Sequence, residues 1–317
     1  MSAAPQLAPL PIKDRPRLKP ENRGRIGIGR ALVDQCSFVE AKEAILAYAE
    51  AGGTSAYVLT PNAQHVVLLS SDPRLRQIYR EADLAVPDGA SILLAAWLLG
   101  LSLPQRVAGV DLFEALCEGA ARRGLRVFFL GGRPGSAELA ARRLRGSYPN
   151  LNVATHCPKV GFEADSAEVE RIAAKINSFQ PHLLFVGFGA PKQEYWIYEH
   201  GRHLAVSVCL GIGGAFEMIG GVVPRAPKVL QQLALEWLFR LVLEPRRMWR
   251  RYLIGNSKFL AIVLNQRLAR SLFRMLVQVL RNAHFNPQID DPQAYSRAVQ
   301  LLTRDSAPTE SSSESPN

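Results

Sequence analysis

The sequence predicts an α/β protein with a Rossmann-like, mostly parallel sheet and a C-terminal helical, basic appendage. Short apolar runs alternate with helical stretches over residues 37–285, as in consecutive βαβ units. Glycine-rich segments follow three of these runs, and almost continuous helix follows Pro227. With 317 residues, of which 48% are hydrophobic and 21% charged, the chain can bury a sizeable core and does not resemble a disordered protein.

Six short runs rich in apolar residues are the predicted strands of this sheet. In chain order they are Ser55–Thr60, Leu84–Val86, Arg126–Leu130, Leu151–His156, His182–Gly187 and Leu204–Leu210. No repeat of 20–50 residues is visible, so a solenoid is not expected.

Helix starts are marked by short polar residues ahead of apolar-periodic stretches. Ser37 and Glu40 have the spacing of a capping box, and the helix that they open should end at the Gly52–Gly53 pair. Ser136 should open a helix that Gly146 closes. The helices predicted after Pro227 are Val229–Leu243, Arg246–Ile254 and Phe259–Leu280.

These elements divide the chain into four segments with different charge. We predict a flexible N-terminal tail over residues 1–25, a Rossmann-like body over 26–226, a helical basic appendage over 227–285 and a disordered tail over 286–317. The formal net charge is +10, yet residues 26–239 hold equal numbers of basic and acidic side chains, whereas residues 240–285 hold ten basic residues and Glu244 alone. This distribution argues against a nucleic-acid-binding body and indicates that the appendage meets an anionic surface.

The appendage also has the residue types of a membrane-surface helix. Arginines at i, i+1, i+4 and i+5 form a cationic stripe there: Arg246, Arg247, Arg250 and Arg251. Trp249 and Tyr252 lie among them and suit a membrane interface. A solvated or RNA-binding helix is the alternative. The longest uncharged run, Gly89 to Gln105, has 17 residues and is too short for a typical membrane span, so we expect a buried helix there.

The ends and the cysteines of the chain indicate a reducing compartment. The proline-rich N-terminus has no apolar segment of the kind found in secretory signals. The four cysteines lie far apart and form no C-x-x-C pair, so neither a zinc ribbon nor a disulfide framework is expected. We therefore predict a cytoplasmic protein.

Three glycine-rich segments follow predicted strands: Leu130–Ser136, Gly187–Pro191 and Gly211–Gly214. Glycine at the carboxyl end of a parallel strand lets the backbone approach a phosphate, so the glycines favour a nucleotide or nucleotide-sugar pocket over simple turns. The dinucleotide spacing G-x-G-x-x-G is absent, which disfavours a dehydrogenase, and so is the P-loop motif of nucleotide triphosphatases. The candidate binding glycines are Gly131, Gly132, Gly187, Gly189 and Gly213.

Two polar turns also follow strands: Thr60-Pro61-Asn62 and Pro87-Asp88-Gly89. A Pro-Asp-Gly turn is commonly structural, but a carboxylate at the ligand edge of the sheet can also accept a proton from a nucleophilic hydroxyl. Arg106 lies 18 residues after Asp88 and can stabilise a diphosphate charge. Gln193 stands at a predicted helix start, where it either faces solvent or binds sugar hydroxyls.

Six motifs, in this order, resemble the WecG/TagA/CpsF family of glycosyltransferases over residues 26–260. They are Thr60–Asn62, Pro87–Gly89, Arg106–Leu112, Phe129–Gly132, Val186–Glu194 and Gly211–Phe216. The resemblance implies a Rossmann-like enzyme that transfers a sugar, typically N-acetylmannosamine, from a UDP donor to a saccharide on a polyprenyl diphosphate. It also implies inversion at the sugar and a place at the inner face of the cell membrane.

The resemblance also implies roles for single residues. Asp88 falls on the position of the catalytic base, Thr60, Asn62 and Gln193 on pocket-lining positions, and Arg106 on a position associated with substrate phosphate. The arginines of the appendage match in kind those that meet the lipid diphosphate. The long basic continuation to Arg281 and the acidic tail depart from the family pattern.

No metal or other cofactor is expected. The chain has no D-x-D motif, Asp290-Asp291 lies in the polar tail, and the six histidines show no ligand spacing. The leaving UDP is then stabilised by arginines and backbone N–H groups. His65, three residues after Asn62, is either a second base or a structural histidine.

The leading interpretation is therefore an inverting, metal-independent glycosyltransferase of cell-surface or exopolysaccharide synthesis. Two alternatives stay open: a UDP-glucose or UDP-uronate transferase that acts on a longer lipid-linked oligosaccharide, and a non-catalytic nucleotide-sugar or RNA-binding module. The expected partners are the UDP-sugar, the polyprenyl-diphosphate acceptor and an anionic membrane surface, without nucleic acid. The donor sugar and a homo-oligomeric state stay open.

Overall fold

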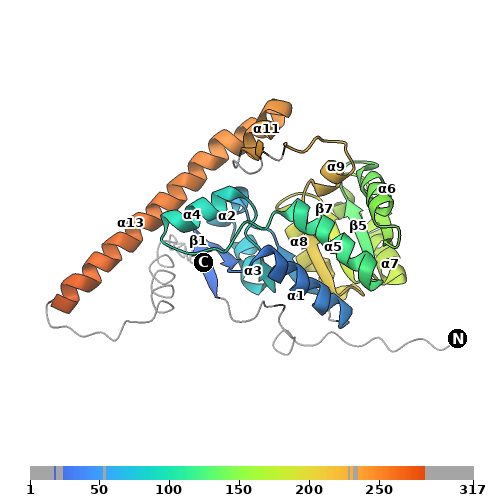
Figure 1. Ribbon diagram of the computed structural model, residues 1–317, viewed down its shortest axis with the longest axis horizontal. Coiled ribbons are helices and arrows are strands. Elements are labelled where there is room, and N and C mark those ends of the chain that lie inside the picture. Colours follow the sequence, from blue (N-terminus) through green and yellow to red (C-terminus); the bar gives the residue numbers. More distant parts are fainter. Residues whose placement is uncertain (1–17, 19–23, 53–54, 228, 231–234, 283–317) are drawn as a thin grey trace, which may run out of the picture. The chain divides into compact units, whose positions relative to one another are not determined.

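A computed structural model describes residues 18, 24–52, 55–227, 229–230 and 235–282 of the chain (Figure 1). It separates into two compact units, one up to Gln266 and one from Arg267 onward. The sheet and all predicted body motifs belong to the first unit. The predicted tail over 286–317 and nearly all of the predicted tail over 1–25 lie outside the described residues, and the four-segment division stays a prediction.

The sheet has six strands, and every hydrogen-bonded pair of them is parallel. Their spatial order is β4-β3-β8-β7-β5-β6. In chain order the strands are β3 (Ala56–Leu59), β4 (Leu84–Ala85), β5 (Arg126–Gly131), β6 (Asn152–His156), β7 (Leu183–Gly187) and β8 (Val208–Gly211). The predicted fold class and all six predicted strands are confirmed.

The last strand begins later than the apolar pattern predicts. Residues from Leu204 to Ser207 form bends, because the Leu204 N–H donates to Gly201 O and the Val206 N–H donates to Leu204 O. The N–H groups of Leu204 and Val206 are thus used locally, although Val206 O and Ser207 O accept from the Ser55 and Ala56 N–H groups, and the regular strand β8 begins at Val208.

A two-stranded antiparallel hairpin precedes the sheet and was not predicted. It comprises β1 (Arg25–Ile28) and β2 (Ala31–Asp34). The Asp34 carboxylate accepts from the Ala85 N–H at 2.7 Å and pairs with Arg25 at 2.8 Å, so it fastens the hairpin to the edge strand β4. The body therefore begins with a separate two-stranded sheet and not directly with the first helix.

Helices cover both faces of the sheet (Figure 1). One apolar cluster joins the sheet to α1 (Phe38–Glu50), α5 (Gly109–Arg123), α6 (Ser136–Ser147) and α9 (Ala215–Ile219). A second cluster lies on the other face and joins it to the hairpin and to α2 (Ala63–Ser71), α3 (Pro73–Glu81), α4 (Ala90–Leu98), α7 (Ser166–Phe179) and α8 (Lys192–His200). Alternate side chains of a strand enter opposite clusters, as the pleat requires.

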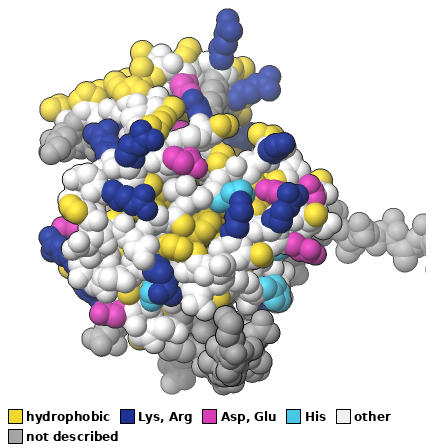
Figure 2. All heavy atoms as spheres, turned by 90° about the vertical axis from the view of Figure 1, so that its right-hand side faces the viewer, with side chains coloured by type: hydrophobic (Ala, Val, Ile, Leu, Met, Phe, Trp, Pro, Cys, Tyr) yellow, Lys and Arg dark blue, Asp and Glu magenta, His cyan; other side chains and the backbone are white. Residues whose placement is uncertain are grey.

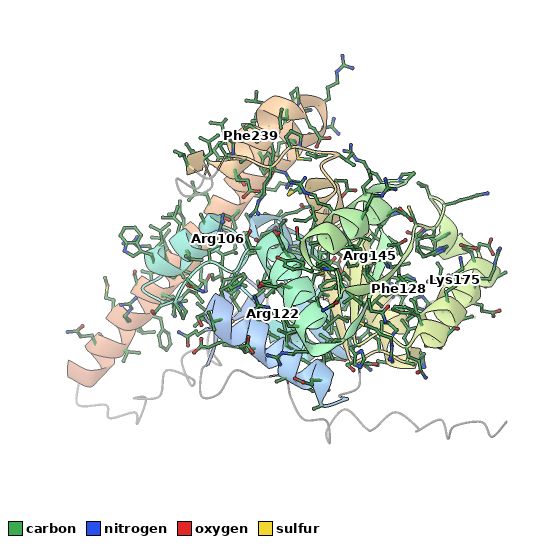
Figure 3. All side chains as sticks on the ribbon, turned by 45° about the vertical axis from the view of Figure 1, so that its right-hand side comes forward. Arg106, Arg122, Phe128, Arg145, Lys175 and Phe239 are labelled. Atoms are coloured by element: carbon green, nitrogen blue, oxygen red, sulfur yellow. The ribbon has the colours of Figure 1, made fainter. Side chains whose placement is uncertain are left out.

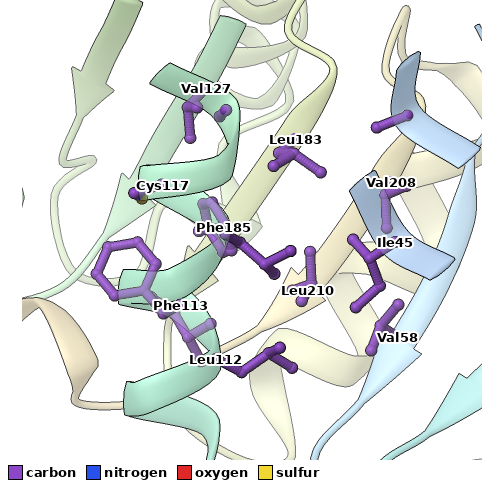
Figure 4. Packing of buried hydrophobic residues seen from close by; sticks show 14 of the residues in the cluster. Ile45, Val58, Leu112, Phe113, Cys117, Val127, Leu183, Phe185, Val208 and Leu210 are labelled. Carbon is purple, nitrogen blue, oxygen red and sulfur yellow. The ribbon is translucent and has the colours of Figure 1, made fainter. Parts of the chain in front are cut away.

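Four phenylalanines of the first cluster pack against one another, and Figure 4 shows two of them, Phe113 and Phe185, among neighbouring aliphatic side chains. Ring centroids of Phe113 lie 4.7 Å from Phe185, 5.1 Å from Phe129 and 5.5 Å from Phe216, all edge to face. This is the arrangement that aromatic quadrupoles favour. Because Phe216 directly follows the loop after β8, the core reaches that loop.

One predicted helix start is confirmed and one is wrong. Ser37 and Glu40 form the complete capping box of α1. The N-cap of α6, however, is Gly135, in the left-handed region at φ +80, and Ser136 is buried in the first turn. The helix also runs through Gly146 to Ser147. Glycine adopts the required backbone at an N-cap without a side-chain hydrogen bond.

The C-terminal part is helical as predicted, with different boundaries. It contains α11 (Glu236–Leu243), α12 (Pro245–Trp249), the π-helical turn η4 (Arg250–Ile254) and α13 (Gly255–Asn282). Residues 228 and 231–234 of the first predicted helix lie outside the described residues. Phe259 and Val263 of α13 belong to the second apolar cluster, so this part of α13 packs on the body.

A pair of hydrogen bonds fastens α13 to the hairpin. Gln266 accepts from the Gly29 N–H at 2.7 Å and donates to Gly27 O at 2.9 Å. A Cβ on Gly29 would lie 2.9 Å from Ile262, and Gly29 has φ +57, so only glycine suits this turn. The predicted appendage is thus joined to the first unit as far as Gln266.

The uncharged run Gly89–Gln105 contains α4, which is only partly buried. Ile92, Ala95 and Ala96 face the core, whereas Leu94 is 56% and Trp97 73% exposed. Among the described helices, none is both long enough and apolar enough to cross a bilayer.

Candidate active site

The predicted motifs meet at one edge of the sheet because all six strands are parallel and their carboxyl ends share that edge. The motif turns follow β3, β4, β5, β7 and β8. Hydrogen bonds join neighbouring turns: Gly132 N–H donates to Gly187 O at 3.0 Å, and the Thr60 hydroxyl donates to Gly211 O at 3.2 Å. Residues more than 150 positions apart therefore form one cluster, the loop edge.

The glycines of the loop edge allow close packing between loops. A Cβ on Gly131 would lie 2.6 Å from the Phe188 ring, and one on Gly211 would lie 2.6 Å from Gln193 Nε2. The N–H groups of Gly132, Gly189 and Gly213 donate to acceptors within the protein. In this structure these three groups are engaged in loop packing, so their predicted role in phosphate binding stays a prediction.

Asp88 lies in the turn between β4 and α4, next to the first residue of α5. Its Oδ1 accepts from the Gly109 N–H at 3.3 Å, and its own N–H donates to Pro61 O at 2.9 Å. Burial raises the pKa of the Asp88 carboxyl, and the charge of Glu236 adds to this, whereas Gly109, His65 and Arg106 oppose it. The side chain is partly exposed, so it can meet a substrate hydroxyl.

Asn62 and Thr60 flank the Asp88 turn. Asn62 is the N-cap of α2: its Oδ1 accepts from the Gln64 N–H, and its own N–H donates to His65 Nδ1 at 3.3 Å. A Cβ on Gly89 would lie 4.0 Å from the Asn62 Cβ. Thr60 is buried. The structure therefore brings both residues beside the candidate base, and their contact with substrate stays a prediction.

Gln193 is buried, although a helix-start glutamine was expected to face solvent or sugar. Its Oε1 accepts from the N–H groups of Gly189 at 3.2 Å and Gly213 at 2.9 Å, and its Nε2 donates to Glu194. The side chain thus connects the loops after β7 and β8. Direct binding of sugar hydroxyls by Gln193 stays a prediction.

Arg106 lies among acidic residues that the sequence interpretation did not include. Its guanidinium is 3.9 Å from Asp111 on α5 and 3.8 Å from Glu236 on α11, and Asp111 also pairs with Arg225 at 2.6 Å. Figure 3 labels Arg106 on the side of the molecule where α11 carries Phe239. The four-residue spacing of Glu236 and Arg240 in a predicted helix was the one available sign that α11 presents both to one side.

Arg240 belongs to the same region. One of its Nη atoms would lie 3.6 Å from a Cβ on Gly214, so the guanidinium reaches the loop after β8. Helix α11 therefore contributes one acidic side chain, Glu236, and one basic side chain, Arg240, to the loop edge. The arginines at this edge can hold an anionic substrate, and the partly buried carboxylate of Asp88 can accept a proton.

The predicted lipid-diphosphate arginines lie beyond α11. Arg246 and Arg250 are exposed, and the Arg250 guanidinium lies 5.3 Å from the centre of the Trp249 ring. The side chains of Arg247 and Arg251 lie outside the description. Figure 2 shows a face of the body on which basic and acidic side chains are interspersed, in keeping with its even charge.

No group of three or more His, Cys, Asp or Glu side chains suited to a metal ion is present in the described part of the chain. A cavity of about 300 Å³ lies at the opposite edge of the sheet, and none of the predicted site residues lines it. The chemistry that the sequence predicts is therefore concentrated at the loop edge.

Comparisons with known proteins identify the class of this enzyme. The family model described as "Glycosyl transferase WecG/TagA/CpsF family" matches residues 26–272, so the chain belongs to this family and is a glycosyltransferase. A Bacillus spizizenii protein named N-acetylglucosaminyldiphosphoundecaprenol N-acetyl-beta-D-mannosaminyltransferase is 32% identical over 66% of this chain and 79% of its own length. A Staphylococcus aureus protein with the same name is 29% identical over 68% and 81%. The predicted family is confirmed.

The raised pKa of Asp88 predicts a change in stability. The folded protein binds a proton at Asp88 more readily than the unfolded chain, in which an aspartate has a pKa near 3.8. As the pH rises through the raised pKa, ionisation in the folded state lowers the free energy of unfolding. Asp88→Asn removes the ionisable group, so its urea midpoint at pH 7 should exceed that of wild type, by a margin that shrinks toward about pH 4.

The matched control is Asp165→Asn, which retains an N-cap residue on α7 at an exposed position. Its midpoint should follow that of wild type across the same pH range. A midpoint of Asp88→Asn at or below wild type at pH 7 would contradict the assignment of a burial penalty to the Asp88 carboxylate.

Proposed function

We propose that this glycosyltransferase is an inverting, metal-independent enzyme that moves an N-acetylmannosamine-type sugar from a UDP donor to a polyprenyl-diphosphate-linked saccharide. The observation that carries this proposal is the Asp88 carboxylate at the loop edge, with a raised pKa and arginines nearby. The B. spizizenii and S. aureus relatives, about four-fifths of whose length matches this chain, are named for transfer of N-acetylmannosamine to N-acetylglucosaminyl-diphosphoundecaprenol, which supports this sugar and this acceptor.

In the proposed reaction Asp88 removes the proton from the acceptor hydroxyl. The hydroxyl oxygen then forms a bond to the anomeric carbon, and the bond from that carbon to the UDP oxygen breaks on the opposite face. The bonding electrons stay on the β-phosphate, so the sugar is inverted and UDP leaves with an added negative charge. Arg106 and Arg240 are the side chains best placed to stabilise it.

Glu236 limits how Arg106 performs this role. The two side chains lie 3.8 Å apart without substrate, so a bound diphosphate would compete with the Glu236 carboxylate for the guanidinium. Transfer of glucose or a uronic acid to a longer oligosaccharide is the second candidate, since donor identity depends on a few pocket contacts.

We further propose that the enzyme is cytoplasmic and binds the inner face of the cell membrane through its C-terminal helices. On α13, Leu260, Leu264, Leu268, Leu272 and Leu276 are all exposed and recur every four residues, so each is a surface neighbour of the next along the helix. Basic residues are interspersed among them, with Arg246 and Arg250 shortly before. Apolar side chains with arginines suit an anionic bilayer surface.

Asp88→Asn should lower turnover by roughly 10²-fold or more, the usual scale for loss of a general base. The measurement is transfer from UDP-N-acetylmannosamine to N-acetylglucosamine linked to undecaprenyl diphosphate, with Asp165→Asn as the control that retains activity. A folded Asp88→Asn protein with near wild-type turnover would refute Asp88 as the base. A binding module without catalysis would show no transfer even in the wild type.

Activity should persist in excess EDTA, because the proposed stabilisation of UDP uses arginines. The same transfer assay is run with the chelator and then with added Mg²⁺ or Mn²⁺. Loss of activity in EDTA that either ion restores would contradict the metal-independent mechanism.

Substitution of Arg246, Arg247, Arg250 and Arg251 by Gln should weaken binding to liposomes that contain anionic lipid. Glutamine keeps helix propensity and removes the charge, at about 1 kcal/mol per basic residue near such a surface. Sedimentation with liposomes at low and high salt is the measurement, since added salt screens the attraction.

A matched control replaces four basic residues of the body, Arg122, Arg142, Arg171 and Lys175, by Gln. Both variants lose the same charge, so only the position differs. Truncation near residue 240 is a poorer test, because Phe259, Val263 and Gln266 pack on the body. Equal liposome binding by wild type and the appendage variant would show that the arginines are merely solvated.

A further inference from the structure

One buried carboxylate lies between the two halves of the loop edge. Glu194 on α8 is 2% exposed. Its Oε1 accepts from Gln193 Nε2 at 2.8 Å and lies 3.4 Å from His65 Nε2. Gln193 belongs to the side of the site built by β7 and β8, and His65 to the side built by β3. Glu194 thus connects them a second time, besides the hydrogen bond from Thr60 to Gly211.

On the first side, Glu194 fixes which way the Gln193 amide points. Because the Nε2 group donates to the carboxylate, Oε1 faces the N–H groups of Gly189 and Gly213, from which it accepts. The reverse orientation would set an NH₂ group against two N–H donors and an oxygen against a carboxylate. A single carboxylate therefore determines the hydrogen bonds that connect two glycine loops.

On the second side, the Glu194 carboxylate faces the ring of His65, whose tautomer the Asn62 N–H determines. Since Nδ1 accepts from the Asn62 N–H, the ring hydrogen of the neutral form is on Nε2, which faces Glu194 Oε1. His65 is 4% exposed, so the ring has no solvent alternative. Through this ring the carboxylate supports the N-cap of α2, whose Asn62 lies beside the Asp88 turn.

The surroundings of Glu194 are buried, and among the residues that the structure describes His65 Nε2 and Glu194 Oε2 have no hydrogen-bond partner. The hydroxyls of Tyr57 and Tyr79 are also buried, and burial, with the charge of Glu194 as the second cause, raises the pKa of both. In such a buried region an acceptor that loses its donor is costly, so loss of the Gln193–Glu194 hydrogen bond should disturb the loops that Gln193 connects.

We propose that Glu194 is a positioning residue for glycosyl transfer, acting through Gln193 on the glycine loops that receive the donor and through His65 on the Asn62 and Asp88 turns. The inference rests on the proposed function, since the loops matter to the donor only in a nucleotide-sugar enzyme. Small misplacements of reacting groups lower rates steeply, by about 10²-fold for 1 Å.

The test is Glu194→Met, which keeps side-chain length and removes the acceptor. We expect the dissociation constant for UDP to rise about tenfold or more and kcat/KM to fall further, because donor loops and base turn are both affected. Glu194→Gln should recover most of the loss, since its amide oxygen can still accept from Gln193 and lie opposite His65 Nε2. The measurements are UDP titration by calorimetry and steady-state transfer with varied donor.

A second variant approaches the same network from the other side. In His65→Asn, the shorter side chain can still accept from the Asn62 N–H but no longer reaches Glu194. We expect kcat to fall about tenfold while the UDP dissociation constant changes less, since the Gln193 side is intact. If Glu194→Met does not fold, His65→Asn still tests whether the contact between Glu194 and His65 positions the site.

The matched control is Glu81→Met. Glu81 on α3 binds Tyr198 of α8 at 3.0 Å and Arg202 at 2.7 Å, at the other end of α8. Its loss should lower the urea midpoint and leave UDP affinity unchanged.

Several results would overturn the proposal. Wild-type UDP affinity and kinetics in Glu194→Met would do so, as would an equal loss of UDP affinity in Glu81→Met, or unchanged kcat in a folded His65→Asn. A wild type that binds no UDP would contradict the proposed donor itself. If the wild type and the Glu194 variant bind UDP equally well, the proposed donor stands and only the role of Glu194 is wrong. The two failures can therefore be told apart.

Discussion

Close approach of the loops at the carboxyl edge of the sheet is the constraint on which the candidate site depends. Glycines bring neighbouring backbones together, and the partly buried N–H groups of these loops then need acceptors. Gln193 supplies one oxygen to two of these groups, and Glu194 holds that amide in place. The residues that pack the edge and those that would meet the substrate are consequently the same few, so stability and chemistry cannot be changed independently here.

Much of the fold follows from local sequence, and the failures have physical causes. Apolar runs predict all six strands, because strands buried on both faces are nearly continuous in hydrophobicity. The hairpin was missed because its turn is completed by Gln266, more than 230 residues away. The start of α6 was misplaced because Gly135 adopts a left-handed N-cap that a side-chain rule does not detect. Short-range patterns carry no information about either contact.

The site was predictable in its position and less so in its contacts. Parallel strands bring motif turns to one edge, so Asp88, Asn62 and Arg106 were expected there. The burial of Gln193, and the pairing of Arg106 with Glu236, depend on how α8 and α11 pack. Helical periodicity predicts that these residues lie in helices, but it does not say which loop they contact.

The strand order also determines when the site comes into existence. β8 is the last strand along the described part of the chain, yet it lies in the middle of the sheet between β3 and β7. Until the ribosome has released residues beyond Gly211, the pair β3–β4 and the group β5–β6–β7 have no common neighbour, and the unpaired sides of β3 and β7 are open to other contacts. A nascent or truncated chain therefore has two separate partial sheets, and its substrate loops assemble only when the final strand joins them.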